Sequence, residues 1–188
     1  MSDSIYDEAY YTGGRGAYRH YEYNAKWKRR ASRLMARFGD ARTFLDVACA
    51  RGFLLRGYVE NGVNPEDVYG IDISEWAVAH SESIISHRTR CCSIFDFSPT
   101  VRWDLVTAYD FLEHIEKERM QEVVSILEEC CGKYLQVVLM ISKASWDTDV
   151  SHQSIMPLDE WIGYFNLRLH DTETCGHVVT ATFERIGE

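Results

Sequence analysis

Residues 43–54 read Thr-Phe-Leu-Asp-Val-Ala-Cys-Ala-Arg-Gly-Phe-Leu, and this stretch decides the fold class. Its first five residues predict a short apolar strand, and a helix is expected over about 52–62. The strand carries Asp46 near its end, although an unpaired carboxylate is costly to bury. A strand that passes through a glycine-containing turn into a helix is the opening unit of an α/β sheet.

The same alternation continues along the rest of the chain. Residues 134–141 form a continuous apolar run, which is typical of a central parallel strand that is buried on both faces. Strands separated by helices predict a mainly parallel sheet that is covered by helices on both faces. The further expected elements are strands at 67–73, 90–95 and 103–108, helices at 75–86, 116–131 and 158–165, and a hairpin around Cys175 and Gly176.

The first 40 residues precede this alternation. Residues 6–24 are rich in tyrosine and glycine, show no clean period, and predict an ordered loop or arm. Over 25–38, apolar residues recur three and four positions apart, which predicts a helix with one apolar face. The 188 residues fit a single domain, with the arm and helix over 1–40 and the α/β core over 41–188.

The composition excludes several classes of protein. Hydrophobic residues make up 46% and charged residues 26%, which is typical of a globular chain rather than a disordered one. No apolar run reaches the roughly 18 residues of a membrane helix, and the acidic N-terminus does not resemble a signal peptide. The six cysteines lack zinc spacing, and the net charge is −9. We therefore expect a cytoplasmic protein without a bound metal, for which nucleic acid is an unlikely partner.

Acidic residues end or follow three of the expected strands. Asp46, Asp72 and Asp96 occupy these positions. Ligands of open α/β sheets bind at the carboxyl ends of the strands. Because charged carboxylates are poor core material, these three residues indicate a ligand with hydroxyl and amine donors.

Three segments, in the same order and spacing, resemble class I S-adenosylmethionine-dependent methyltransferases. Residues 44–54 resemble motif I of that family, Tyr-Gly-Ile-Asp-Ile-Ser at 69–74 resembles its second-strand motif, and 103–115 resembles its fourth-strand segment, with Leu-Glu-His-Ile at 112–115. The resemblance covers about 43–185. It implies a Rossmann-like, seven-stranded, mainly parallel sheet with an antiparallel last strand. It also implies that S-adenosylmethionine is the cofactor and S-adenosylhomocysteine the product.

The resemblance also assigns cofactor-binding residues one by one. Asp46 matches the acid that helps to hold the amino end of the cofactor, and Asp72 matches the acid that binds the two ribose hydroxyls. Gly52 matches the last glycine of motif I, where the backbone approaches the cofactor. The remaining matches are Ile73 beside the adenine, Asp96 and Phe97 at the adenine edge, and Tyr109 and Asp110 at the methionine end.

Motif I departs from the family pattern at two positions. Many members have glycine where this chain has Ala48, and often where it has Ala50. If the backbone at Ala48 has a positive φ, alanine costs roughly 1–2 kcal/mol there; if φ is negative, the methyl group narrows the pocket. A non-catalytic S-adenosylmethionine-binding partner of a larger enzyme is therefore one alternative function.

The acceptor is expected to be a hydroxyl of a sugar, a glycan precursor or a specialised metabolite. The segment Asp149-x-x-His152, followed by a helix that carries Trp161, resembles small bacterial methyltransferases of sugar and polysaccharide biosynthesis. Asp149 would orient His152 as a general base, with His114 as the second candidate.

The N-terminal arm resembles the same subset, because tyrosines and a Gly-Gly pair precede a helix that carries Trp27. Tyr11 and Tyr18 are the expected lid residues, and a homodimer or a partner enzyme is the other way to close the site. Eight of the 20 lysines and arginines lie between Arg15 and Arg37. An RNA methyltransferase that uses this basic helix is thus a further alternative, although a charge run is more often a solvated face.

Overall fold

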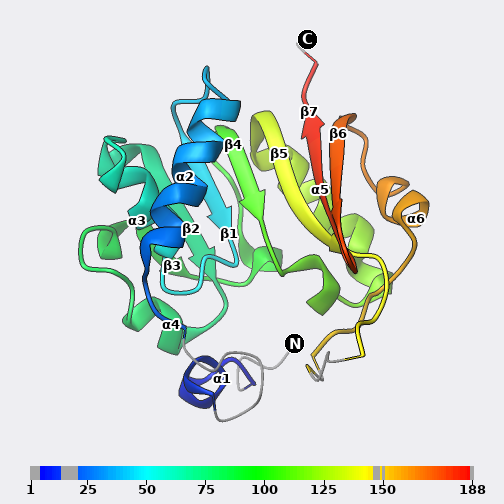
Figure 1. Cartoon of the computed structure of the whole chain (residues 1–188), viewed down its shortest axis with the longest axis horizontal. Helices are drawn as coiled ribbons and strands as arrows, with labels where there is room; N and C mark the ends of the chain where they lie inside the picture. Colours follow the sequence, from blue (N-terminus) through cyan, green and yellow to red (C-terminus); the bar gives the residue numbers. More distant parts are fainter. Residues whose placement is uncertain (1–4, 14–20, 146–148, 150, 187–188) are drawn as a thin grey trace.

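The computed structural model describes residues 5–13, 21–145, 149 and 151–186 (Figure 1). Its centre is a seven-stranded sheet in the order β3-β2-β1-β4-β5-β7-β6. The strands are β1 (Phe44–Val47), β2 (Val68–Asp72), β3 (Thr89–Cys91), β4 (Trp103–Ala108), β5 (Cys131–Met140), β6 (Arg168–Cys175) and β7 (Val178–Glu184). The helices are α1 (Glu8–Thr12), α2 (Ala25–Arg37), α3 (Phe53–Glu60), α4 (Glu75–Ala79), α5 (Met120–Cys130) and α6 (Leu158–Ile162).

The strands β1 to β5 run parallel, whereas β7 runs antiparallel to both β5 and β6. The predicted α/β fold with a mainly parallel sheet and an antiparallel last strand is thereby confirmed. In the register of the sheet, Asp46 lies opposite Gly70 on one side and Thr107 on the other. Among the described residues, no helix has both the length and the apolar character needed to cross a membrane.

Alternate residues of the central strands supply two separate cores, one on each face of the sheet. Phe44 and Leu105 pack with the apolar side chains of α2 and α3. Leu45 and Val106 pack with those of α5. Helices therefore cover both faces, with α2 and α3 on one side of the sheet and α5 on the other (Figure 1).

The segments that differ from the sequence-based expectation include α4 and the N-terminal arm. The helix expected over 75–86 ends at Ala79, and beyond it the backbone N–H of Glu82 donates to the Arg51 carbonyl oxygen instead of continuing the helical hydrogen bonds. The arm expected as a loop contains α1, which Asp7 caps by accepting a hydrogen bond from the Tyr10 backbone N–H at 3.2 Å. This cap was readable from the sequence. The short helix, which lies beyond the carboxyl end of β1 (Figure 1), buries Tyr10 and Tyr11.

The turn between β1 and α3 is held in an unusual backbone conformation. Ala48, Ala50 and Gly52 all have positive φ angles, of 59°, 47° and 72°. The left-handed region suits glycine and is strained for alanine, so the energetic cost foreseen at Ala48 applies at both alanines. A Cβ atom at Gly52 would meet the end of the Ile85 side chain, which would have to shift.

Replacing Ala48 by glycine is expected to stabilise the cofactor-free protein. The change removes about 1–2 kcal/mol of strain from the left-handed backbone. It also makes the unfolded chain more flexible, which lowers the stability by about 0.4–1 kcal/mol. A net gain of up to about 1.6 kcal/mol corresponds to a rise in Tm of up to about 3–6 °C for a chain of this size. Thermal unfolding measures it, with Ala36→Gly, in the exposed last turn of α2, as the matched control. That control should lose stability, by at most about 0.5–1 kcal/mol. An equal loss in both variants would show that Ala48 is not strained.

Candidate active site

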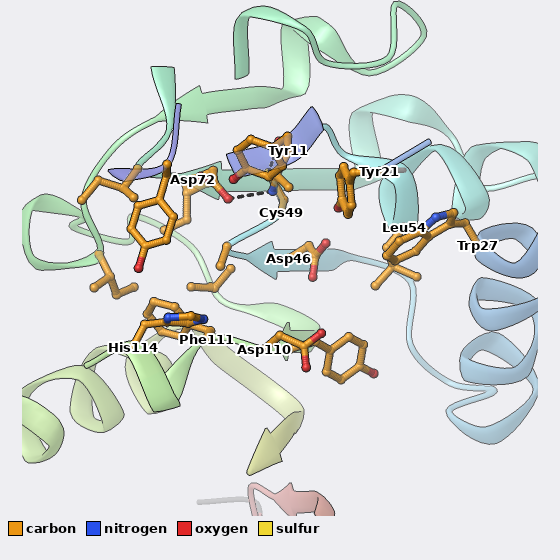
Figure 2. Close-up of a pocket in the computed structure, with 18 of the residues that line it drawn as sticks. Tyr11, Tyr21, Trp27, Asp46, Cys49, Leu54, Asp72, Asp110, Phe111 and His114 are labelled. Carbon is orange, nitrogen blue, oxygen red and sulfur yellow. Dashed lines mark hydrogen bonds between the residues drawn. The ribbon is translucent and has the colours of Figure 1, made fainter. Parts of the chain in front are cut away.

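A cavity of about 690 Å³ lies at the carboxyl ends of β1, β2 and β4 (Figure 2). Its volume falls within the usual range of small-molecule sites. The arm and α2 form part of its wall, together with the turns that follow these strands. It is lined by Tyr6, Tyr10, Tyr11, Tyr21, Glu22, Asn24, Lys26, Trp27, Arg29, Arg30, Arg33, Asp46–Ala50, Leu54, Ile71–Ile73, Cys92–Phe95, Tyr109–Phe111, His114 and Ile115.

Most of the predicted cofactor residues meet at this cavity. Asp46, Ala48, Ala50, Asp72, Ile73, Tyr109, Asp110 and Tyr11 all line it. Figure 2 shows Asp46, Asp72 and Asp110, from three different strand ends, around the same space. The predicted lid residue Tyr18 lies outside the described residues.

Three of the predicted cofactor-binding residues are not among the described residues that line the cavity. Gly52 packs against Ile85 instead. Asp96 is exposed, and Phe97 stacks on Tyr69 in the core. β3 ends at Cys91, and residues 92–95, which directly precede Asp96 and Phe97, line the cavity on this side.

The Asp72 side chain links the turns that follow β1 and β2. Its buried carboxylate accepts hydrogen bonds from the backbone N–H of Ala50, at 2.7 Å, and of Ser74, at 2.8 Å. Burial raises the pKa of Asp72 to about 6, although these two hydrogen bonds oppose the rise. Ser74 in turn donates its hydroxyl to the carbonyl oxygen of Tyr6, which fastens the arm to the same turn.

Asp46 is the second buried carboxylate of the cavity. It accepts a hydrogen bond from the Thr107 hydroxyl at 2.6 Å, across the register described above. Burial raises the pKa of Asp46 to about 7, while Thr107 and the nearby Arg30 guanidinium oppose the rise. A positively charged ligand group beside Asp46 would stabilise its ionised form.

Aromatic side chains of the arm cover the cavity. Tyr11 stacks on Trp76, with ring centroids 5.5 Å apart, and Tyr21 stacks on Phe53 at 4.8 Å. Tyr6 and Tyr10 are buried and meet edge to face. The arm thus packs on the turns that carry the carboxylates, in the place where the sequence analysis expected a lid.

The base candidates are connected differently from the expected pair. The Ser151 hydroxyl and backbone N–H both donate to Asp149, and the Ser151 hydroxyl oxygen lies 2.9 Å from His114 Nδ1. Since the single hydroxyl hydrogen is used on Asp149, His114 Nδ1 must be the donor to Ser151. The neutral His114 ring therefore carries its lone pair on Nε2.

His152, the expected base, has a looser link to Asp149. Its Nε2 lies 4.0 Å from the carboxylate, and it is not among the described residues that line the cavity, whereas His114 is. Burial would raise the pKa of Asp149, but the Ser151 hydrogen bonds and the two histidines lower it below its usual value. Ser151 was not predicted from the sequence, because no motif or spacing marks it.

Trp161, the helix tryptophan of the predicted acceptor segment, is fully buried in the core, where it donates to the Met140 carbonyl oxygen.

Comparisons with known proteins identify the family and the fold. Residues 18–185 match the family model described as a methyltransferase domain. No curated protein matches the sequence significantly.

Among solved structures, similar folds occur in three methyltransferases of different organisms. An S-adenosylmethionine-dependent methyltransferase from Clostridium acetobutylicum has a TM-score of 0.70 at 13% identity, covering 95% of this chain and 96% of that one. Magnesium protoporphyrin IX methyltransferase from Synechocystis, with bound S-adenosylhomocysteine, has a TM-score of 0.67 at 14% identity, with 97% and 98% covered. The N-methyltransferase NodS from Bradyrhizobium japonicum, also with S-adenosylhomocysteine, has a TM-score of 0.64 at 16% identity, with 85% and 86% covered.

The raised pKa of Asp46 predicts a specific pH dependence of stability in the ligand-free protein. An unfolded aspartate titrates near about 3.9, whereas Asp46 titrates near 7 in the fold. Between these values the folded state holds a proton that the unfolded state has released, so Asp46 lowers stability as the pH rises. Asp46→Asn keeps a hydrogen-bond acceptor for Thr107 and lacks this cost. The Tm of the variant should therefore exceed that of the wild type by an amount that grows from pH 4 to pH 7 and then levels off. Parallel Tm curves for the two proteins would contradict the assignment.

Proposed function

Because this chain belongs to the methyltransferase domain family, we propose that it transfers the methyl group of S-adenosylmethionine to a hydroxyl of a small-molecule acceptor. One observation carries this proposal. A single cavity is lined by Asp46 and Asp72 at the strand ends and by His114, whose Nε2 carries the lone pair. The cavity thus combines groups for the cofactor with a group for the acceptor.

The two buried carboxylates suit the polar parts of the cofactor. Asp46 would accept hydrogen bonds from the ammonium group, and Asp72 from the ribose hydroxyls. A hydrogen bond to a charged group contributes about 1.5–3 kcal/mol. Ile73 and Phe95 supply apolar wall for the adenine. Two of the similar folds described above contain bound S-adenosylhomocysteine, which supports this use of the cavity.

Methyl transfer is a displacement at carbon. The acceptor oxygen attacks the methyl carbon, the carbon–sulfur bond breaks, and its electron pair stays on sulfur to give S-adenosylhomocysteine. His114 Nε2 would take the proton of the hydroxyl, with Ser151 and Asp149 holding the ring and stabilising its charged form. Alignment of the two reactants supplies about 7–11 kcal/mol and base catalysis about 10²–10⁴-fold.

The basic helix points to an acceptor that carries a negative charge. Lys26, Arg29, Arg30 and Arg33 of α2 all line the cavity, so the charge run seen in the sequence is not simply a solvated face. Arg30 lies over the Tyr109 ring at 4.4 Å and opposes the raised pKa of Asp46. A sugar or specialised metabolite with a carboxylate or phosphate group fits this wall better than a neutral one.

Binding of S-adenosylmethionine and S-adenosylhomocysteine by titration calorimetry tests the cofactor assignment. Asp72→Ala should weaken the binding at least about tenfold, a loss of about 1.4 kcal/mol. The matched control is Asp67→Ala, next to the opposite end of the same strand. Asp72→Ala also removes the hydrogen bonds that hold the turns after β1 and β2. Asp46→Asn therefore serves as a second variant, in which Asp72 keeps these hydrogen bonds. Equal affinities in all four proteins would contradict the proposed site.

Replacement of His114 tests the base. His114→Gln should lower turnover by about 10²–10⁴-fold and leave cofactor affinity within about twofold. The exposed His177, which bonds to Ser142, provides the control variant His177→Gln. Release of S-adenosylhomocysteine is followed with a panel of sugar phosphates, uronic acids, phenolic acids, primary amines and a short RNA. Turnover of the amines or the RNA alone would contradict the hydroxyl acceptor. Cofactor binding without turnover of any acceptor would favour the non-catalytic alternative.

A further inference from the structure

A cluster of three ligand-type side chains lies beside the cavity. A carboxylate oxygen of Glu113 and ring nitrogens of His114 and His152 are all within 4.8 Å of one another. Glu113 and His114 are buried, and His152 is half-buried. The rings of the two histidines are 4.9 Å apart. Such spacing needs only small side-chain movements to surround a single ion.

Glu113 is not explained by the reaction described above. Its side chain is 2% exposed, and its Oε2 atom has no hydrogen-bond partner among the described residues. The negative charges of Asp110 and Asp149 also act on the Glu113 carboxyl group. An unpartnered carboxylate oxygen in a buried, negatively charged surrounding is costly, and a cation would remove this cost.

His114 is already oriented as metal-binding histidines usually are. Its Nδ1 donates to Ser151, which is held by Asp149, so the lone pair is on Nε2. In metal sites, the ring nitrogen that does not bind the ion typically donates to such a partner, which fixes the tautomer.

We propose that Glu113, His114 and His152 hold a divalent transition-metal ion at the edge of the cavity. Two imidazoles and one carboxylate favour Zn²⁺, Mn²⁺, Co²⁺ or Fe²⁺ over the oxygen-loving Mg²⁺ and Ca²⁺. Three protein ligands leave coordination positions open, as in catalytic rather than structural sites. This replaces the expectation from the sequence that no metal is bound.

The ion would face the acceptor, because His114 and the neighbouring Asp110 line the cavity. Where the proposed methyl transfer holds, the ion would bind the acceptor oxygen and lower the pKa of its hydroxyl. With the ion bound, the Nε2 lone pair of His114 would be used as a ligand and the acceptor proton would pass to solvent water. His114 would act as the base described above only in the metal-free protein. The ion site itself rests on the cluster and not on the reaction.

Metal titration of the full chain tests the site. The protein is stripped with a chelator, dialysed, and titrated separately with Mn²⁺, Co²⁺, Zn²⁺ and Mg²⁺ by calorimetry, and the visible absorption of Co²⁺ reports its coordination. We expect one equivalent of Co²⁺ or Zn²⁺ to bind, and Mg²⁺ to bind at least 100-fold more weakly. Glu113→Gln and His152→Ala should each weaken Co²⁺ binding at least tenfold.

The control variant carries His87→Ala and Glu66→Gln, which remove an exposed histidine–glutamate pair with a 3.2 Å contact. It should bind Co²⁺ like the wild type. The proposal is overturned if the wild type binds no stoichiometric Co²⁺ or Zn²⁺. It is also overturned if the control loses Co²⁺ binding while Glu113→Gln and His152→Ala keep it. Calorimetry with S-adenosylhomocysteine on the same variants shows that they are folded. Metal binding without cofactor binding would sink the proposed function and leave the ion site standing.

Discussion

The buried carboxylate of Asp72 is the constraint on which the site depends. It takes hydrogen bonds from the turns after β1 and β2, and Ser74 on the second turn bonds to the arm. Three segments that are distant in the sequence therefore meet at one point. Because hydrogen bonds to a carboxylate are stronger than neutral ones, this junction sets the position of both turns and of the aromatic cover.

The same junction explains the strain in the first turn. The backbone N–H of Ala50 donates to Asp72 from a turn that is left-handed on both sides of Cys49, and alanine occupies both left-handed positions. Strain of this kind persists where the surrounding structure determines the backbone, and it is concentrated at functional sites. Here the strained turn forms part of the cavity wall, so the residues that carry the cost in stability also line the cavity.

Charge is distributed unevenly around the cavity. Asp46 and Asp72 are buried at the cofactor side, and Arg30 is the cation that opposes the raised pKa of Asp46. Near His114, Asp149 adds a negative charge, and Glu113 adds a buried carboxyl group. Buried charges are normally paired or bound to a cation, so both ends of the cavity are suited to positively charged partners. An ammonium group at one end and a metal ion at the other would meet this requirement.

The alternation of strands and helices, the acids at the strand ends and the family resemblance were all readable from the sequence, because they depend on local pattern and order. Asp46 and Asp72 consequently lie where they were expected. The end of β3 at Cys91 was not readable from the sequence, nor was the lining of the cavity by residues 92–95. Only the tertiary structure joined His114 to Asp149 through Ser151 and placed Glu113 with His152. These contacts link segments that follow different strands, and local sequence carries no signal for the side chains that long-range folding brings together.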